Sequence, residues 1–121
     1  MSFMSKILIA DDNAQNLYLA RFLLENKGHE IEEVVNGALA VEAAEKDYYD
    51  LILMDIQMPV LDGLEATRQI KSKDNAPVIV ALTAKAMSGD AEDILAAGCE
   101  GYIVKPIESR NFSSQVESYI K

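Results

Sequence analysis

The hydrophobic and polar positions of this chain alternate between short apolar runs and longer amphipathic stretches. One run, Leu51-Ile52-Leu53-Met54, is apolar at every position and ends on Asp55. Continuous hydrophobicity predicts a strand covered on both faces, as in a parallel sheet between two layers of helices. The apolar runs together predict five strands, at residues 6–10, 30–35, 51–54, 78–82 and 101–104.

Helices are predicted between and after these strands, where apolar residues recur at three- and four-residue steps. The first follows an N-cap at Asp12 or Asn13 and ends with a C-cap at Gly28. The second follows the turn at Asn36-Gly37, and the third is capped by Asp62. The apolar positions that define the helices include Leu17, Ala20, Leu23, Leu24, Leu64, Ile70, Ala91, Ile94, Leu95, Phe112, Val116 and Ile120.

Strands and helices alternate five times, with short connections and no repeat or linker. This order predicts an α/β fold, a doubly wound sandwich in which right-handed crossovers place helices on both faces of a parallel sheet. At 121 residues, with 50% of them hydrophobic, the chain is long enough to bury a core of its own. We therefore expect one domain over residues 1–121, with residues 1–5 as a short leader.

Composition narrows the classes of function. Twenty acidic residues against eleven basic ones give a formal net charge of −9, which argues against direct nucleic-acid binding because that requires clustered Lys and Arg. The single cysteine, Cys99, leaves no internal disulfide and fits a reducing compartment. The amino terminus shows neither a signal peptide nor a membrane-spanning run, so we expect a cytoplasmic protein without membrane insertion.

Charged and hydroxyl side chains follow four of the predicted strands. Asp11 and Asp12 end the first strand and Asp55 ends the third, while Thr83 and Lys105 follow the fourth and fifth. The carboxyl ends of parallel strands share one edge, where open α/β sheets bind ligands, so we expect these side chains to converge. Converging carboxylates repel one another. A bound Mg²⁺ or Mn²⁺ would relieve the repulsion because such ions take oxygen ligands.

This combination of groups is typical of phosphoryl transfer. Asp55 would be the nucleophile and form an aspartyl phosphate. Lys105 would pair with the phosphoryl group, and the Thr83 hydroxyl would donate a hydrogen bond to one of its oxygens. Simpler interpretations exist for each residue alone, since Asp11-Asp12 and Thr83 also suit helix N-termini. Convergence with Asp55 and Lys105 favours a site over a cap for the Asp11-Asp12 pair.

The chain resembles the receiver domains of two-component response regulators from residue 7 to about residue 120. Five motifs in the expected order carry this resemblance, namely Asp11-Asp12-Asn13, Leu53-Met54-Asp55-Ile56-Gln57-Met58-Pro59, Asp62-Gly63, Leu82-Thr83-Ala84 and Lys105-Pro106. The resemblance implies a flavodoxin-like (βα)5 sandwich with the strand order 2-1-3-4-5.

The resemblance also implies roles for individual residues. Asp55 matches the phosphoacceptor, which takes its phosphoryl group from a phosphohistidine. Asp12 and Asp55 match direct metal ligands. The backbone carbonyl of Gln57 matches a third ligand, and Asp11 acts mainly through metal-bound water. Lys105 matches the phosphate-binding lysine.

Further positions match the parts of the family that respond to phosphorylation. Thr83 matches the switch hydroxyl, and Tyr102 matches the switch aromatic whose rotamer follows phosphorylation. The Lys105–Pro106 bond is expected to be cis, which an X–Pro bond permits at low cost. Gln57 and Lys85, two positions after the phosphoacceptor and the switch hydroxyl, lie where the family tunes the lifetime of the phosphoryl group.

The implied function is phosphorelay signalling through protein–protein contacts, as a monomer or a phosphorylation-dependent dimer. The implied partners are a histidine kinase or histidine phosphotransfer protein and a downstream protein target. Such a domain is not an enzyme for external substrates, since it catalyses only its own phosphorylation and dephosphorylation. Two settings stay open: a stand-alone receiver, or a receiver excised from a hybrid histidine kinase, which residues 75–90 also resemble.

Two other classes compete with this interpretation. A Mg²⁺-dependent phosphatase with an aspartyl intermediate commonly has a second acid two residues after the nucleophile, where this chain has the amide Gln57. A flavodoxin-like nucleotide binder needs a glycine-rich first loop, which the sequence at 11–13 lacks. The remaining distinctive residues are assigned to structure and packing, namely His29, Cys99, Met54, Met58 and Met87.

Overall fold

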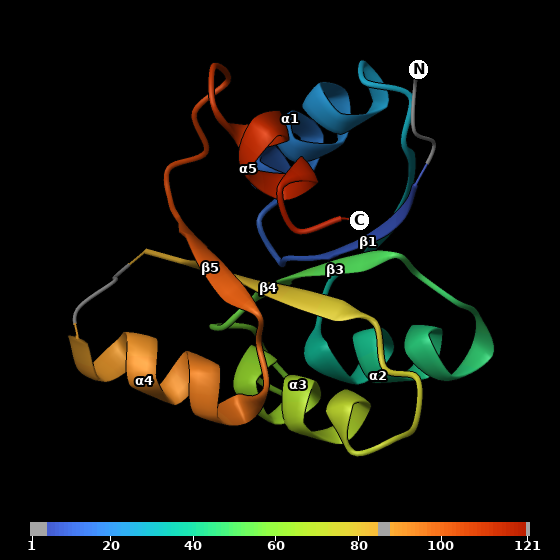
Figure 1. Ribbon diagram of the computed structural model, residues 1–121, viewed down its shortest axis with the longest axis vertical. Coiled ribbons are helices and arrows are strands. Elements are labelled where there is room, and N and C mark those ends of the chain that lie inside the picture. The colour runs from blue at the N-terminus through green and yellow to red at the C-terminus, as the bar shows by residue number, and fades with distance from the viewer. Residues whose placement is uncertain (1–4, 85–87, 121) are drawn as a thin grey trace.

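The computed structural model describes residues 5–84 and 88–120. Its elements follow the predicted alternation of strands and helices (Figure 1). They are β1 (Lys6–Ala10), α1 (Ala14–Glu25), β2 (Glu30–Val34), α2 (Gly37–Lys46), β3 (Leu51–Asp55), α3 (Gly63–Lys71), β4 (Val78–Thr83), α4 (Ser88–Ala97), β5 (Gly101–Val104) and α5 (Phe112–Glu117). The predicted leader therefore lies outside the described residues apart from Ser5, and so do Lys85 and Met87.

The strands form one parallel sheet in the order β2-β1-β3-β4-β5, which confirms the expected topology. β3 lies at the centre, with Leu53 paired to Ile9 of β1 and to Val80 of β4. The chain moves outward from β1 to β2 and then returns past β1 to β3. The reversal of strand order between β1 and β3 is the point where open sheets form a ligand crevice.

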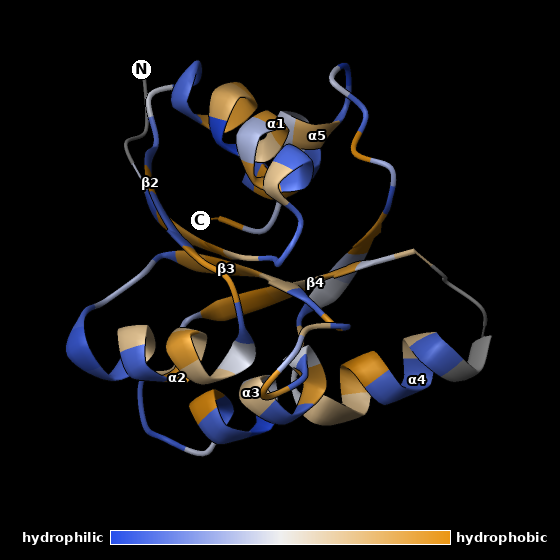
Figure 2. Cartoon of the chain, turned by 180° about the vertical axis from the view of Figure 1, so that it is seen from behind, coloured by the Kyte–Doolittle hydropathy of each residue, from blue (hydrophilic) through white to orange (hydrophobic). Residues whose placement is uncertain are grey.

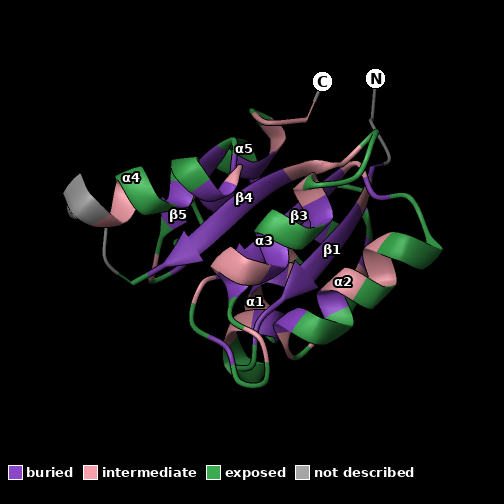
Figure 3. Cartoon of the chain, turned by 90° about the horizontal axis from the view of Figure 1, so that it is seen from below, coloured by how far each residue is buried: buried purple, intermediate pink, exposed green. Residues whose placement is uncertain are grey.

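Helices cover both faces of the sheet, with α1 and α5 on one side and α2, α3 and α4 on the other (Figure 1). Alternate residues of β3 enter the two cores, since Leu51 and Leu53 face α1 and α5 while Ile52 and Met54 face the other layer. All of β3 is buried, as its continuous hydrophobicity predicts. The inner strands β1, β3 and β4 are hydrophobic and largely buried, whereas the edge strand β2 carries three glutamates and is only partly buried. The outer faces of the helices are mostly polar and exposed (Figures 2 and 3).

Several predicted boundaries differ from the structure. β3 and β4 extend one residue further than predicted, to Asp55 and Thr83, because the carboxyl ends of neighbouring strands stay paired. Helix α1 has its C-cap at Asn26, two residues before the predicted cap at Gly28. Gly28 has φ of +94° and forms the turn after the helix, in which its N–H donates to the carbonyl of Glu25.

The residues assigned to packing are buried where they are described. His29, Cys99, Met54 and Met58 are all buried. The His29 ring also joins two distant segments, because Ser5 N–H donates to its Nδ1 and its Nε2 lies 2.9 Å from Glu117 Oε2 in α5. Since Nδ1 accepts, Nε2 carries the proton and donates to Glu117. Among the described residues, no helix is long and apolar enough to cross a membrane.

Candidate functional site

A cavity of about 260 Å³ opens at the carboxyl edge of the sheet, over the switch point between β1 and β3. Residues from five segments of the chain surround it, and most of them follow the end of a strand. They are Asp12, Asn13, Asn16, Asp55, Ile56, Gln57, Thr83, Ala84, Asp90 and Lys105. The parallel arrangement thus brings together residues that are far apart in the sequence.

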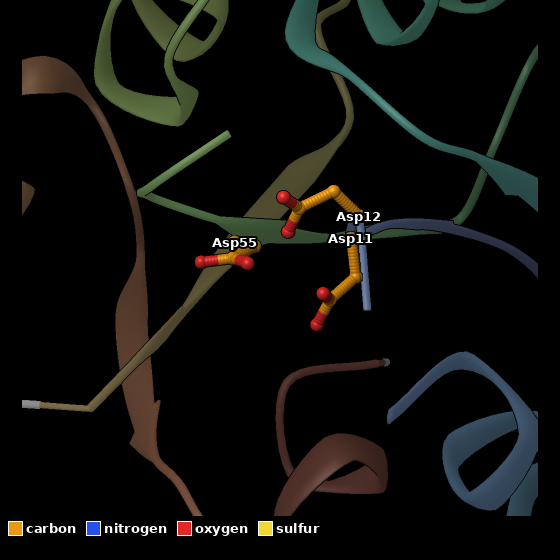
Figure 4. A group of neighbouring side chains, drawn as sticks. All are labelled: Asp11, Asp12 and Asp55. Carbon is orange, nitrogen blue, oxygen red and sulfur yellow. The ribbon is translucent and has the colours of Figure 1, made fainter. Parts of the chain in front are cut away.

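Three carboxylates converge beside this cavity. Asp11 and Asp12 follow β1 and Asp55 ends β3, and one oxygen from each lies within 4.8 Å of the others (Figure 4). Asp11 is fully buried and Asp55 is 5% exposed, whereas Asp12 is exposed. Two of the three carboxylates are therefore largely removed from water. Their mutual repulsion is stronger in the protein interior than it would be in water.

Local hydrogen bonds hold the loop after β1 in place. The N–H of Asp11 donates to the carbonyl of Val34 at the end of β2, at 3.1 Å. Asp11 Oδ1 accepts from the N–H of Asn13 at 2.9 Å, and the Asn13 side chain caps α1 by accepting from the N–H of Asn16. Both Asp12 and Asn13 suit the N-cap by sequence, and the structure has Asn13 in that position. Asp12 is thereby left to face the cavity.

Lys105 bridges two of the carboxylates. Its Nζ lies 3.1 Å from Asp55 Oδ2 and 3.2 Å from Asp11 Oδ2. Its backbone N–H donates to the carbonyl of Thr83 at 2.7 Å, which continues the β4–β5 pairing beyond the strands. The Lys105–Pro106 peptide bond is cis. The ammonium group therefore contacts Oδ2 of Asp55, whereas the loop after β3 contacts Oδ1 through the N–H of Gln57.

Burial and charge act against each other at Asp55. Burial raises the pKa of its carboxyl, as does the charge of Asp11, whereas the Gln57 N–H at 3.1 Å from Oδ1 and the Lys105 ammonium act to lower it. Burial by itself would lower the pKa of Lys105. The hydrogen bond to Asp55 and the charges of Asp11 and Asp55 outweigh that effect, so the net pKa of Lys105 is raised.

The oxygen atoms of this cluster suit a divalent cation. Asp11 Oδ2 is buried and accepts no hydrogen bond from residues 5–84 and 88–120. Lys105 lies within ion-pair distance of that atom, but one ammonium faces three carboxylates. Mg²⁺ and Mn²⁺ prefer oxygen ligands in open sites that retain water. The exposed Asp12 and the two buried carboxylates beside the cavity offer such ligands.

The structure brings most of the predicted site residues together. Asp12, Asp55, Gln57, Thr83 and Lys105 line the cavity, and Asp11 lies beside it. Tyr102 is separate from the cavity lining. It is half-buried on β5, pairs with Ala81 rather than with Thr83, and packs against the core on the α2–α4 side. Thr83 itself is 2% exposed.

Two residues in the cavity wall have no counterpart in the sequence prediction. Asn16 lies in the first turn of α1 and Asp90 in the first turn of α4. Each is a polar residue at the beginning of a helix that follows a site-bearing strand. That placement is the signal by which they can be found, because these helix N-termini lie at the same edge as the strand ends.

Comparison with known proteins gives one consistent family. The family model for the response regulator receiver domain matches residues 7–117. The polar-differentiation response regulator DivK of Brucella anthropi is 44% identical over 117 residues, which cover 94% of each chain. Probable histidine kinase 1 of rice, Oryza sativa subsp. indica, is 34% identical over 96% of this chain but only 15% of the kinase.

Solved structures agree with these relatives. The receiver domain of a sensor histidine kinase from Pseudomonas aeruginosa, which holds a magnesium ion in its active-site cleft, is 37% identical with a TM-score of 0.88, over 97% of this chain and 98% of the other. The chemotaxis response regulator CheY4 of Vibrio cholerae is 26% identical with a TM-score of 0.91, over 98% of this chain and 100% of the other.

Proposed function

Because this chain belongs to the response regulator receiver domains of two-component systems, we propose that it forms one receiver domain that accepts a phosphoryl group on Asp55. The observation that carries the proposal is the position of Asp55. It is the last residue of the central strand, its Oδ2 lies 3.1 Å from Lys105 Nζ, and it faces a cavity open to solvent. The phosphoryl group would come from a phosphohistidine of a kinase or phosphotransfer protein.

The chemistry is nucleophilic displacement at phosphorus. An Asp55 carboxylate oxygen forms the new bond to phosphorus, and the bond from phosphorus to the donor nitrogen breaks. The Lys105 ammonium, which now contacts Asp55, pairs with the oxygens of the transferred group. The Thr83 hydroxyl donates to one of those oxygens from the cavity wall. These two residues therefore orient and neutralise the group after transfer.

Mg²⁺, or Mn²⁺ in its place, is the cofactor that this donor set fits. Asp12, Asp55 and the Gln57 carbonyl would hold the ion, and Asp11 would act through metal-bound water. The buried Asp11 Oδ2, which accepts no hydrogen bond within residues 5–84 and 88–120, supports this assignment, and so does the magnesium ion described for the Pseudomonas aeruginosa domain. When bound, the ion neutralises negative charge on the transferred phosphoryl oxygens.

Phosphorylation would act on other proteins through a change of shape. When Thr83 is drawn toward the phosphoryl group, it vacates space near β5 that the Tyr102 ring occupies. The half-buried position of Tyr102 supports this role, because a ring at the core boundary can exchange between an inner and an outer rotamer. The face formed by α4, β5 and α5 then differs between the two states.

We propose that the protein acts in the cytoplasm, as a monomer or a phosphorylation-dependent dimer. Its partners would be a histidine kinase or histidine phosphotransfer protein and a downstream protein target. The higher identity with DivK, 44% against 34% for the rice kinase, favours a DivK-like receiver over one excised from a hybrid kinase. The protein would not act as an enzyme on external phosphoesters, since exposed Gln57 lacks a carboxylic acid.

Labelling with acetyl phosphate tests the assignment. Wild type with Mg²⁺ is expected to gain one phosphoryl group by intact-mass spectrometry, and Asp55→Asn is expected to gain none. Asp50→Asn is the matched control, because Asp50 lies at the amino edge of the sheet, where its Oδ2 accepts from Lys6 N–H. Equal labelling of Asp55→Asn and wild type would show that the phosphoacceptor is another residue.

A further inference from the structure

The loop between β3 and α3 carries Gln57 and is anchored at both of its ends. Ile56 N–H donates to the carbonyl of Leu82 at 3.2 Å, and Gly63 N–H donates to the carbonyl of Ile56 at 3.1 Å. Gln57 N–H donates to Asp55 Oδ1. The backbone of Gln57 is therefore placed by this loop, directly against the proposed phosphoacceptor.

The middle of the loop contains a tight turn at Val60. Leu61 N–H donates to the carbonyl of Pro59 at 2.8 Å, and Val60 between them has φ of +70°. A β-branched side chain rarely adopts this left-handed conformation, which is strained and persists only where the surroundings impose it. The Val60 side chain is 82% exposed, so its own packing does not impose the turn.

The first residue of α2 contacts the turn directly. Gly37 N–H donates to the carbonyl oxygen of Leu61 at 3.1 Å. A Cβ atom at Gly37 would lie 2.1 Å from the same oxygen and 3.1 Å from the carbonyl oxygen of Asp62. The φ of Gly37 is not in the left-handed region, so glycine is required here for the close approach of two backbones.

We propose that Gly37 is a positioning residue for the metal and phosphoryl pocket. By bringing α2 against Leu61, it holds the turn at Val60 and thereby the backbone of Gln57 that faces Asp55. This inference rests on the proposed function of that pocket. Gly37, at the start of α2, would thus influence phosphoryl transfer although the reacting groups all lie on other elements.

A methyl group at Gly37 would force the two backbones apart by about 1 Å. If Leu61 moves, the displacement reaches Gln57 through a turn that is already strained. If α2 moves instead, it pulls on the segment after Val34, whose carbonyl accepts from the N–H of Asp11. One movement therefore ends at Gln57, whose N–H contacts Asp55, and the other ends at Asp11.

The test compares Gly37→Ala with Gly28→Ala in the full chain. Gly28 has φ of +94° and would have no atom within 4 Å of an added Cβ, so Gly28→Ala strains the fold without touching the loop. By calorimetric titration, Gly37→Ala is expected to weaken Mg²⁺ binding about tenfold or more. In EDTA, it is expected to shift the amide resonances of Gln57 and Gly63. Gly28→Ala is expected to lower Tm and change neither quantity.

Val60→Gly provides a second, independent variant. Glycine accepts the positive φ and lets the turn adjust, so Val60→Gly added to Gly37→Ala is expected to recover part of the lost Mg²⁺ affinity. If Gly37→Ala does not fold, Val60→Gly alone tests whether the turn positions Gln57. The loosened turn is then expected to weaken Mg²⁺ binding about twofold or more at unchanged Tm, and unchanged affinity would overturn the proposal.

The outcomes separate this inference from the proposed function. If wild type binds no Mg²⁺ and accepts no phosphate from acetyl phosphate, the proposed function fails and the inference fails with it. If wild type does both, and Gly37→Ala matches Gly28→Ala in Mg²⁺ affinity and in the Gln57 resonance, the proposed function stands. In that case Gly37 has only a structural role.

Discussion

Acidic side chains and a lysine meet at both edges of the sheet, but their charges are balanced differently. At the amino edge, Lys6 Nζ is hydrogen-bonded to Asp47 and lies 3.4 Å from Glu32 Oε2, and its backbone N–H donates to Asp50. The hydroxyl of Tyr49 donates to the other oxygen of Glu32. These carboxylates are therefore satisfied by groups of the chain itself.

At the carboxyl edge, burial is deeper and compensation is incomplete. Lys105 faces both Asp11 and Asp55, Asp12 adds a third carboxylate, and Asp11 Oδ2 accepts no hydrogen bond within the described residues. The pKa of Asp47 at the amino edge is lowered, chiefly by its hydrogen bond with Lys6, whereas burial raises the pKa of Asp55. Similar residue types thus form a satisfied network at one edge and the proposed phosphoacceptor site at the other.

The largest expected effect is on the rate of phosphorylation. Lys105→Met removes the cation proposed to pair with the transferred group, so the rate with acetyl phosphate and Mg²⁺ is expected to fall about 100-fold. Lys6→Met is the same substitution at the amino edge and is expected to leave that rate within about twofold. Intact-mass spectrometry over time measures both rates. Equal losses in the two variants would contradict the distinction between the edges.

The second effect is on the stability of the metal-free protein. Asp55→Asn removes a charge whose burial is unfavourable and which repels Asp11, so it is expected to raise the free energy of unfolding by about 1 kcal/mol and Tm by about 3–5 °C in EDTA. Asp50→Asn, at the amino edge of the sheet, is expected to raise neither the free energy of unfolding nor Tm. Thermal unfolding followed by circular dichroism measures the difference, and a lower Tm for Asp55→Asn would refute it.

The third effect is a pH dependence at the amino edge. Burial, followed by the hydrogen bond to Glu32, raises the pKa of Tyr49 to about 12 from the ordinary value of 10.0. Because the folded-state pKa is the higher one, the stabilisation is complete below pH 10 and is lost as the pH rises toward 12. Tyr49→Phe is expected to cost about 1 kcal/mol at pH 7.

Urea unfolding of the wild type and Tyr49→Phe at neutral and at alkaline pH measures this dependence. The difference between the two proteins is expected to shrink as the pH passes 10. Phosphorylation of Tyr49→Phe by acetyl phosphate is expected to match that of the wild type. A difference in stability that grows with pH would show that the sign is wrong.

The smallest effect is that of the Lys6 ion pairs. Lys6→Met is expected to lower the free energy of unfolding only slightly, because the side chains of its partners Glu32 and Asp47 are about half exposed to water. The loss is expected to shrink further at high salt, where exposed charges are screened. Urea unfolding at low and high salt measures it, and a loss that is independent of salt would assign the effect to packing of the lysine stem.

Much of this architecture follows from the sequence, because periodicity and strand ends are local properties. The apolar run from Leu51 to Met54 predicts a buried strand that ends on Asp55, and alternation of strands with helices predicts a parallel sheet. The residues that follow the strands must then meet at one edge. Asp11, Asp12, Asp55, Thr83 and Lys105 do meet there. The strand order was supplied by resemblance to a family rather than by local pattern.

What only the tertiary structure decided is how those residues are paired and held. No local pattern indicates that Lys105 contacts both Asp11 and Asp55, or that a buried oxygen of Asp11 accepts no hydrogen bond within the described residues. The contact of Gly37 with Leu61 joins segments 24 positions apart, and the bond of His29 to Glu117 joins segments still further apart. Such contacts depend on distances between packed elements, whereas sequence periodicity reports only which face of each element is buried.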